Sequence, residues 1–251
     1  MNKPKSGARF FMKESIEDLS TQVVLDKEIS HHVVRVLRCS IGDSIDLIAT
    51  DGATYRAELT SDKLPECHAQ ILEKITVDTE SPFHISLLQA LVSNEKLDLI
   101  VQKVIELGVQ EIAVFRSERS QVRLNSDRLS AKLQRWEKIS QSACEQSGRV
   151  ILPKITVYDD LTDLLKSRET HNANKLRMVL TPTGKHTIKA QTGELSGAEI
   201  LVGPEGGFTN DEIILAKNAG FVDTALGPRT LRAETAGIIS VSIVQALWGD
   251  L

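Results

Sequence analysis

Two loops in the second half of the sequence carry the residue types that could do chemistry. One of them, 226–236 (LGPRTLRAETA), holds arginines, a glutamate and threonines between an apolar strand pattern and an apolar helix pattern. Charged groups in such a place are costly unless they are paired or used. An ion pair of Arg232 with Glu234 or another acid is one explanation, and a binding or catalytic role is the other.

The second loop, 203–208 (GPEGGF), follows the apolar residues 200–202 and leads into Thr209-Asn210-Asp211-Glu212, a capping-box pattern that opens a helix. Its glycines allow the backbone to turn sharply and to approach a ligand closely. The segment has no Gly-Lys-Ser/Thr and no Gly-x-Gly, so it is neither a P-loop nor a dinucleotide-binding turn. A tight turn without a ligand is the alternative.

The elements that must position these loops follow from the hydrophobic periodicity. Beyond residue 82, apolar patterns typical of strands and helices alternate. We predict strands at 85–91, 112–115, 178–180, 200–202 and 223–226, and helices at 97–107 (with Gly108 as the C-cap), 129–143 and 233–247. This alternation predicts an α/β fold, with a parallel sheet covered by helices on both faces. Because ligands bind at the carboxyl ends of such strands, both loops are expected to meet at one pocket.

The first 76 residues have a different pattern, typical of a small β-rich domain. Asp26 is the expected N-cap of a short helix, with Ile29, Val33, Val36 and Leu37 on its apolar face. Strands are predicted at 44–48, around 55–59 and at 69–75, with a turn at Asp51-Gly52. The polar segment 76–82 ends in proline and is a reasonable linker, which gives domains at 1–76 and 77–251.

Composition excludes several classes of protein. The 251 residues are 41% apolar and 25% charged, as in soluble globular chains, and no apolar run is long enough to cross a membrane. The start lacks the apolar run of a secretory signal, so a cytoplasmic protein is expected. The net charge of -4 does not favour non-specific nucleic-acid binding by the whole chain. Local basic segments at 1–13 and 116–149 could bind a polyanion, or they could be solvated helix faces.

Metal chemistry is not indicated. Cys39, Cys67 and Cys144 have spacings that fit neither a disulfide framework nor a zinc site. The six histidines show no His-Glu-x-x-His spacing, and the adjacent His31 and His32 cannot point the same way on a helix. We therefore expect no metal, and a metal hydrolase is the least favoured function.

Taken together, the motifs resemble one family. The loops 203–207 and 226–236 are similar to the signature of SPOUT methyltransferases of the RsmE type. Further matching segments are His31-His32-Val33, Val36-Leu37-Arg38, Gly42-Asp43, Gln102-Lys103, Glu106 to Val109, Ser117 to Ser120 and Glu145 to Arg149. At Ser93-Asn94-Glu95-Lys96 this sequence lacks a glycine that many members have, and residues 166–198 show no match.

The resemblance implies a fold and a function. The fold is a PUA-like RNA-binding domain followed by a SPOUT-like parallel sheet with a C-terminal trefoil knot, although general connection rules alone would predict an unknotted sheet. The function is methylation, with S-adenosylmethionine as donor, of ring nitrogen 3 of a uridine in 16S ribosomal RNA, within the assembled 30S particle. A homodimer with each active site at the subunit interface is also implied.

The family pattern and the chemistry together give candidate site residues. Arg232 would stabilise the uracil anion, and Glu234 or Glu205 would accept the proton or orient Arg232. The cofactor has no phosphate, so backbone contacts and an apolar slot are expected from Leu180, Thr181, Pro182, Leu201, Gly203, Pro204, Glu205, Gly206, Leu226, Gly227, Leu231, Thr235 and Ala236. Contacts to RNA phosphates are expected from Arg9, Arg35, Arg38, Arg119, Arg123 and Arg149.

Two other functions stay open from the sequence. Other SPOUT members methylate ribose hydroxyls or transfer RNA bases, and the segment Glu145 to Arg149 and the first domain favour the RsmE type over these. A non-catalytic RNA-binding assembly factor is the other alternative. It would be expected to have eroded donor loops, and both loops here are intact.

Overall fold

A computed structural model of the chain describes residues 8–16, 18–19, 22–122, 126–168, 174–188 and 195–251. It divides into two compact units. The first contains Met1–Glu80 together with Cys144–Ile151, and the second contains Ser81–Ala143 with Leu152–Leu251. The sequence predicted a division between residues 76 and 77, and it did not predict that Cys144–Ile151 belongs to the first unit.

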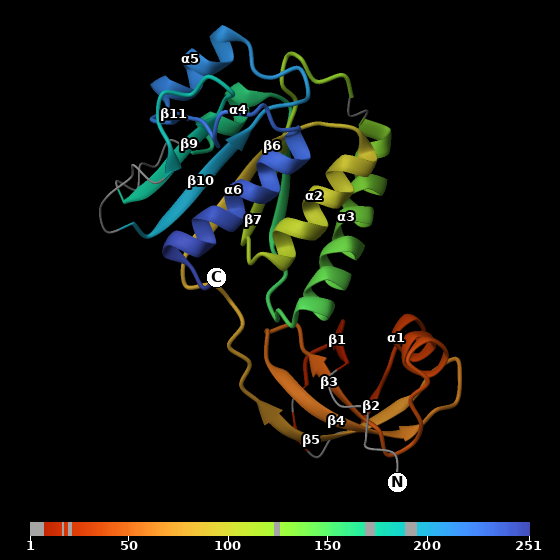
Figure 1. Cartoon of the computed structure of the whole chain (residues 1–251). Helices are drawn as coiled ribbons and strands as arrows, with labels where there is room; N and C mark the ends of the chain where they lie inside the picture. The colour runs from red at the N-terminus through yellow and green to blue at the C-terminus, as the bar shows by residue number, and fades with distance from the viewer. Residues whose placement is uncertain (1–7, 17, 20–21, 123–125, 169–173, 189–194) are drawn as a thin grey trace. The chain divides into compact units, whose positions relative to one another are not determined.

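The first unit is built on a five-stranded sheet in the order β1-β3-β4-β5-β2 (Figure 1). Its strands are β1 (Arg9–Phe11), β2 (Gln22–Val24), β3 (Ser44–Ile48), β4 (Thr54–Ser61) and β5 (His68–Ile75). β1 pairs in parallel with β3, and all other pairs are antiparallel. Tyr55, Ala57 and Leu59 alternate into the buried core, as the period of two in the sequence predicts.

The helix of the first unit corrects one expectation. Asp26 caps α1 (Lys27–His31) by accepting the Ile29 N–H, as predicted. The chain then continues as a π-helical turn, η1 (His32–Val36), in which the Leu37 N–H donates to the His32 carbonyl. The extra residue in this turn rotates the following positions away from α-helical spacing. Val36 is therefore 59% exposed, and its assignment to the apolar face was wrong.

The second unit is built on a six-stranded, all-parallel sheet in the order β11-β9-β10-β6-β7-β8. Its strands are β6 (His84–Ala90), β7 (Glu111–Phe115), β8 (Lys154–Tyr158), β9 (Lys175–Leu180), β10 (Gly197–Val202) and β11 (Val222–Thr224). The central strand β6 is buried from Ile85 to Ala90 because both of its faces are covered. The predicted α/β class is confirmed, whereas β8 was not predicted.

Helices cover the two faces of this sheet (Figure 1). α2 (Asn94–Glu106) and α6 (Ala233–Trp248) pack together on one face, and α4 (Leu161–Lys166) and α5 (Asn210–Asn218) contact the other. Asp98 of α2 accepts hydrogen bonds from Arg135 and Trp136 of α3 (Ser126–Ser147). The predicted capping box at Thr209 and Glu212 is present, and Gly108 has the positive φ of a C-terminal helix stop. The trefoil knot stays a prediction from the resemblance.

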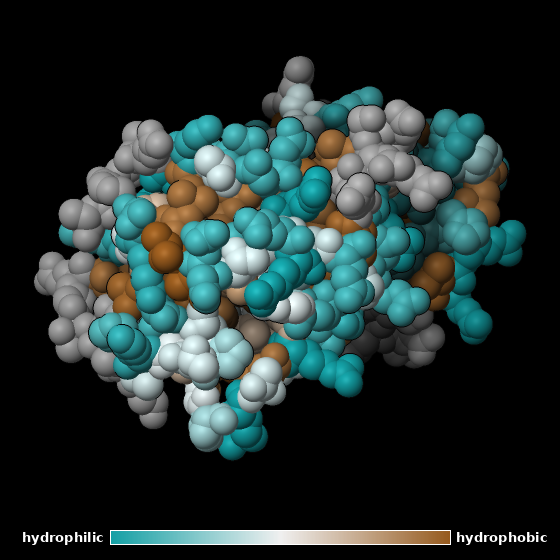
Figure 2. Space-filling view, turned by 90° about the horizontal axis from the view of Figure 1, so that it is seen from above, coloured by the Kyte–Doolittle hydropathy of each residue, from teal (hydrophilic) through white to brown (hydrophobic). Residues whose placement is uncertain are grey.

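Among the residues that the structure describes, no helix combines the length and the apolar character needed to cross a bilayer. The face of the second unit at which its strands end is largely hydrophilic, with hydrophobic residues in small separate patches (Figure 2). Patches of that kind are ordinary on a protein surface.

Candidate functional site

A cavity of about 680 Å³ lies in the second unit, where β9, β10 and β11 end and α6 begins. Both loops singled out in the sequence line it, together with the segment that follows β9. Its wall includes Lys96, Arg119, Leu180, Thr181, Pro182, Gly203, Pro204, Glu205, Gly206, Gly207, Phe208, Leu226, Gly227, Arg229, Leu231, Arg232 and Ala236. The structure therefore brings the two loops together at one site, at the sheet edge where the parallel topology places ligands.

Arg119 holds the backbone of the glycine-rich loop by two hydrogen bonds. Its Nη1 donates to the carbonyl oxygens of Gly206 at 3.1 Å and Phe208 at 3.3 Å. A Cβ on Gly206 would lie 3.2 Å from the Cβ of Arg119, so a larger residue would require Arg119 to shift by a few tenths of an ångström. Arg119 is exposed and was expected to contact RNA, but in the structure its guanidinium supports the cavity wall.

A buried carboxylate anchors the end of the same loop. Glu212, 5% exposed, accepts the N–H of Thr209 in the capping box, and its other oxygen accepts the N–H of Glu118 at 3.0 Å. Ser117 and Ser120 close the turn around Glu118 by a hydrogen bond from the Ser117 N–H to the Ser120 hydroxyl. The motif Ser117 to Ser120 thus positions the glycine-rich loop.

The arginine-containing loop leaves Arg232 available. Arg232 is the N-cap residue of α6, is exposed, and forms no ion pair with any residue that the structure describes. The alternative of an Arg232–Glu234 ion pair is therefore wrong. Glu234 is absent from the cavity wall, and its Oε2 is buried without a hydrogen-bond partner among the described residues.

The segment after β9 forms the third side of the cavity. The Thr181 hydroxyl donates to Asp223, and the Thr181 N–H donates to the Thr224 carbonyl at 3.0 Å. Burial raises the pKa of the Asp223 carboxyl, but the hydrogen bonds from Thr181 and Lys217 outweigh this and the pKa is lowered. Asp223 thus stays ionised at neutral pH and fixes Thr181 against β11.

Two expected cofactor residues are absent from the cavity wall. Leu201 is fully buried and packs in the core cluster with Val179, its partner on β9, and with Leu164 of α4. Successive strand residues face opposite sides of a sheet, and Leu201 points to the side covered by α4 and α5. Thr235 is exposed on α6 and lies outside the wall. Both assignments are corrected.

The sequence did not single out Lys96 as a site residue. Its Nζ lies 2.8 Å from Glu205 Oε1, and both side chains are about one-third exposed, at 30% and 31%. Burial raises the pKa of the Glu205 carboxyl, but the hydrogen bond and charge of Lys96, together with backbone N–H groups, lower it overall. Glu205 is therefore a weaker base than an ordinary glutamate. Lys96 and Glu205 are 109 residues apart in the sequence, so only the folded structure reveals that they form a pair.

The arginines expected to bind RNA occupy different environments. Arg35 and Arg38 are exposed, and Arg38, two residues after the end of the π-helical turn, has a left-handed φ of 56°. The Arg9 side chain is 25% exposed, with its Nε 3.9 Å from Asp46. Arg123 lies outside the described residues.

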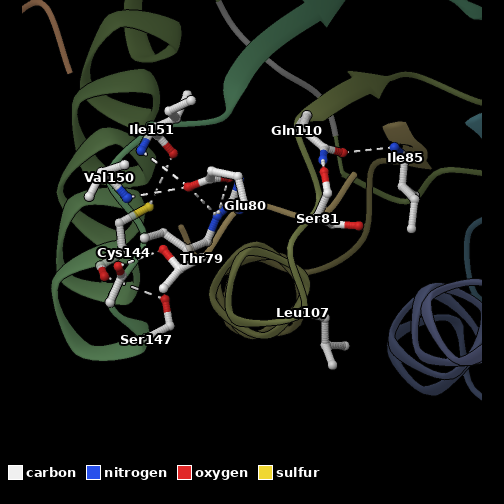
Figure 3. A network of polar contacts seen from close by, with 12 residues as sticks. Thr79, Glu80, Ser81, Ile85, Leu107, Gln110, Cys144, Ser147, Val150 and Ile151 are labelled. Atoms are coloured by element: carbon white, nitrogen blue, oxygen red, sulfur yellow. Dashed lines mark hydrogen bonds and ion pairs between the residues drawn. The ribbon is translucent and has the colours of Figure 1, made fainter. Parts of the chain in front are cut away.

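Arg149 is the clearest correction among them. It is 2% exposed, and its Nε and Nη2 both donate to the Glu80 carboxylate, the shorter distance being 2.6 Å. The same carboxylate accepts the N–H groups of Val150 and Ile151 (Figure 3). Thr79 adds a bond to the Gly148 carbonyl. Arg149 thus forms an ion pair with Glu80 inside the first unit, and the expectation that it contacts an RNA phosphate was wrong.

Comparison with known proteins identifies the family. A family model described as an RNA methyltransferase domain matches residues 79–245, and one described as an RNA methyltransferase PUA domain matches residues 25–72. The chain belongs to the RNA methyltransferase family. The resemblance drawn from the motifs is confirmed, and so is the PUA-like character of the first unit.

Relatives of this methyltransferase cover nearly its full length. It is 33% identical over 99% of the chain, and 96% of the relative, to the ribosomal RNA small subunit methyltransferase E of Buchnera aphidicola. The protein of the same name from Bacillus subtilis is 30% identical, with 94% and 95% covered.

Solved structures agree with the computed one. The ribosomal RNA small subunit methyltransferase E of Neisseria gonorrhoeae, bound to S-adenosylmethionine, is 32% identical with a TM-score of 0.87, covering 98% of this chain and 99% of that one. A Legionella pneumophila structure with the same cofactor is 31% identical with a TM-score of 0.89 and the same coverage. Among the described residues of this chain, no group of histidines, cysteines and carboxylates is arranged to hold a metal ion.

Proposed function

We propose that this protein is a cytoplasmic enzyme that transfers the methyl group of S-adenosylmethionine to ring nitrogen 3 of a uridine in 16S ribosomal RNA, within the 30S particle. The observation that carries the proposal is the cavity, in which a glycine-rich loop and an apolar wall lie beside Arg232, an arginine without an ion-pair partner in the described structure. The small-subunit methyltransferases to which the chain is similar favour ribosomal RNA as the substrate class.

The residues of the cavity fit S-adenosylmethionine. The volume of about 680 Å³ lies within the usual range for small-molecule sites. Leu180, Leu226, Leu231 and Ala236 offer apolar surface for an adenine ring, and the turn at Gly203–Gly207 exposes backbone groups for a ribose. The cofactor supplies an electrophilic methyl group on sulfur. Because it carries no phosphate, the absence of a P-loop pattern agrees with this assignment.

The protein residues must then stabilise the uracil ring as it loses its N3 proton. Arg232 can hydrogen-bond an oxygen on which negative charge accumulates. Glu205 and Glu234 are the two candidates for the proton acceptor: Glu205 lines the cavity but Lys96 lowers its pKa, whereas Glu234 lies outside the wall and has an oxygen without a partner in the described residues. Glu234→Gln should lower kcat, and an unchanged kcat would exclude Glu234.

Recognition of the RNA is assigned to the first unit. Arg35 and Arg38 are exposed on either side of the end of the π-helical turn, and Arg9 is partly exposed. Guanidinium groups in such positions suit phosphate contacts, which set the register of a nucleic acid. The low aromatic content of 4% disfavours a base-stacking platform, so we propose that shape and phosphate contacts dominate.

A glycine next to the cavity gives a direct test of the donor site. A Cβ on Gly184 would lie 2.4 Å from the Thr224 carbonyl carbon and 2.5 Å from the Ala225 nitrogen, so Gly184→Ala must shift the segment after β9. We expect about tenfold weaker binding of S-adenosylmethionine, which corresponds to about 1.4 kcal/mol of backbone strain. Calorimetric titration measures this. Unchanged affinity would mean that Thr181 and Pro182 do not contact the cofactor.

A homodimer is proposed on the face formed by α2 and α6. Leu99 of α2 and Ile239 and Leu247 of α6 are large apolar side chains with 41%, 41% and 43% exposure. The proposal agrees with the expectation from the resemblance that each active site lies at a subunit interface. Sedimentation at micromolar concentration should give a dimer of the 27.7 kDa chain, and Ile239→Arg should dissociate it. Ile214→Arg on α5, where the side chain is 55% exposed, is the control; a monomeric wild type would contradict the proposal.

Transfer of labelled methyl from S-adenosylmethionine tests the function itself. Small ribosomal subunits from cells that lack this protein serve as substrate, with naked ribosomal RNA and transfer RNA alongside. We expect label in the ribosomal RNA of the particles. Label in transfer RNA alone would indicate another target, and failure to bind the cofactor would favour a non-catalytic assembly factor.

A further inference from the structure

Four charged side chains surround the start of α6 and the glycine-rich loop. Lys96, Glu205 and Arg232 all line the cavity, and Glu234 lies in the first turn of α6. The charges of Glu205, Arg232 and Glu234 all act on Lys96, so these three groups lie within electrostatic reach of it. Two cations and two carboxylates can pair in more than one way, and the structure selects one pairing.

The selected pairing places Glu205 at the start of α2. Its carboxylate accepts a hydrogen bond from Lys96 Nζ at 2.8 Å, and Lys96 lies in the first turn of α2, whose N-cap residue is Ser93. A helix N-terminus attracts negative charge because its first N–H groups have no partners within the helix. Glu205 is therefore held by a cation and by the end of a helix, on the side of the cavity wall formed by α2.

The consequence concerns Arg232. A partly exposed ion pair contributes little to stability, so the choice of partner matters more than the strength of the pair. If Lys96 were absent, Glu205 would lose its main cation while Arg232 remained on the same cavity wall. An Arg232–Glu205 pair would then occupy the guanidinium that a substrate anion needs.

We infer that Lys96 is a positioning residue, which holds Glu205 at the start of α2 and so keeps Arg232 free for the RNA base. The inference rests on the proposed function, because it presupposes that Arg232 contacts the reacting ring. It assigns Lys96 no contact with the substrate. If Lys96 only supported the glycine-rich loop, removal of Glu205 would not restore activity to a variant that lacks Lys96. If Lys96 acts by keeping Glu205 away from Arg232, removal of Glu205 should restore that activity.

That compensation is the test. Lys96→Met should lower kcat about tenfold, as expected for directly coupled groups, with the Kd of S-adenosylmethionine changed less than about threefold. Lys96→Arg should keep most activity, because it keeps the cation. The double variant Lys96→Met/Glu205→Gln should recover to within about threefold of Glu205→Gln alone, because no carboxylate remains to occupy Arg232.

Other outcomes overturn the inference. A double variant as slow as Lys96→Met, or Lys96→Met with wild-type kcat, would show that Lys96 does not act through Glu205. Lys166→Met, in an exposed pair on α4, is the matched control and should behave as wild type. If wild-type protein binds S-adenosylmethionine but methylates no RNA, the proposed function fails first, and the kinetic comparison of variants does not arise.

Discussion

Replacing Arg232 by alanine is expected to lower kcat about 100-fold, the effect of removing one donor to a developing anion. The affinity for S-adenosylmethionine should change less than about threefold, because backbone groups and apolar side chains make most of the cofactor site. The expectation follows from the position of Arg232: it is exposed at the cavity wall and has no ion-pair partner among the described residues. It is available to a substrate rather than used within the fold.

Steady-state kinetics with small subunits, combined with calorimetric titration of the cofactor, measure both parts of this prediction. Arg232→Lys is the informative companion, since it keeps the charge but loses the planar fork of donors, and should be intermediate. Wild-type kcat in Arg232→Ala would remove Arg232 from the mechanism. A large loss of cofactor affinity would make it a donor-binding residue instead.

The second large effect is on stability. Arg149→Met should lower the free energy of unfolding of the first unit by about 3 kcal/mol, because it leaves the Glu80 carboxylate largely buried without its cation. Glu80 is 20% and Arg149 3% exposed at the side chain, and the carboxylate also accepts two backbone N–H groups. Breaking one partner of such a network is much more harmful than replacing both.

Urea unfolding of the intact protein, followed by a probe in the first unit, measures this loss. Arg135→Met removes an arginine of comparable geometry whose side chain is 67% exposed, and it should leave unfolding unchanged. The salt dependence of RNA binding should be the same for Arg149→Met and wild type. If Arg149→Met had wild-type stability and its RNA affinity depended less on salt concentration, Arg149 would be a phosphate contact after all.

The sequence predicted much of the fold because the second unit follows simple periodicities. Strand-like apolar runs such as 85–91 and helical spacing such as 97–107 gave a parallel sheet with helices on both faces. The topology then placed loops 203–208 and 226–236 at one edge of the sheet. The caps at Asp26 and Thr209 were predicted because capping is a local interaction.

The misses have physical causes that a local pattern does not contain. Val36 was misplaced because a π-helical turn shifts the helical period by one residue. Leu201 was misplaced because a motif match does not say which face of the strand a residue occupies. Arg149 and Lys96 were misjudged because their partners, Glu80 and Glu205, are 69 and 109 residues away in the sequence. The PUA-like domain and the cofactor came from resemblance rather than from periodicity.

The most direct test of the central claim is nucleoside mass spectrometry of small-subunit ribosomal RNA. RNA is taken from cells lacking this protein, from cells with it restored, and from cells carrying Arg232→Ala. The account predicts 3-methyluridine in small-subunit RNA only where the active protein is restored, at one uridine. The same 3-methyluridine content in all three samples, or a different methylated nucleoside on restoration, would contradict it.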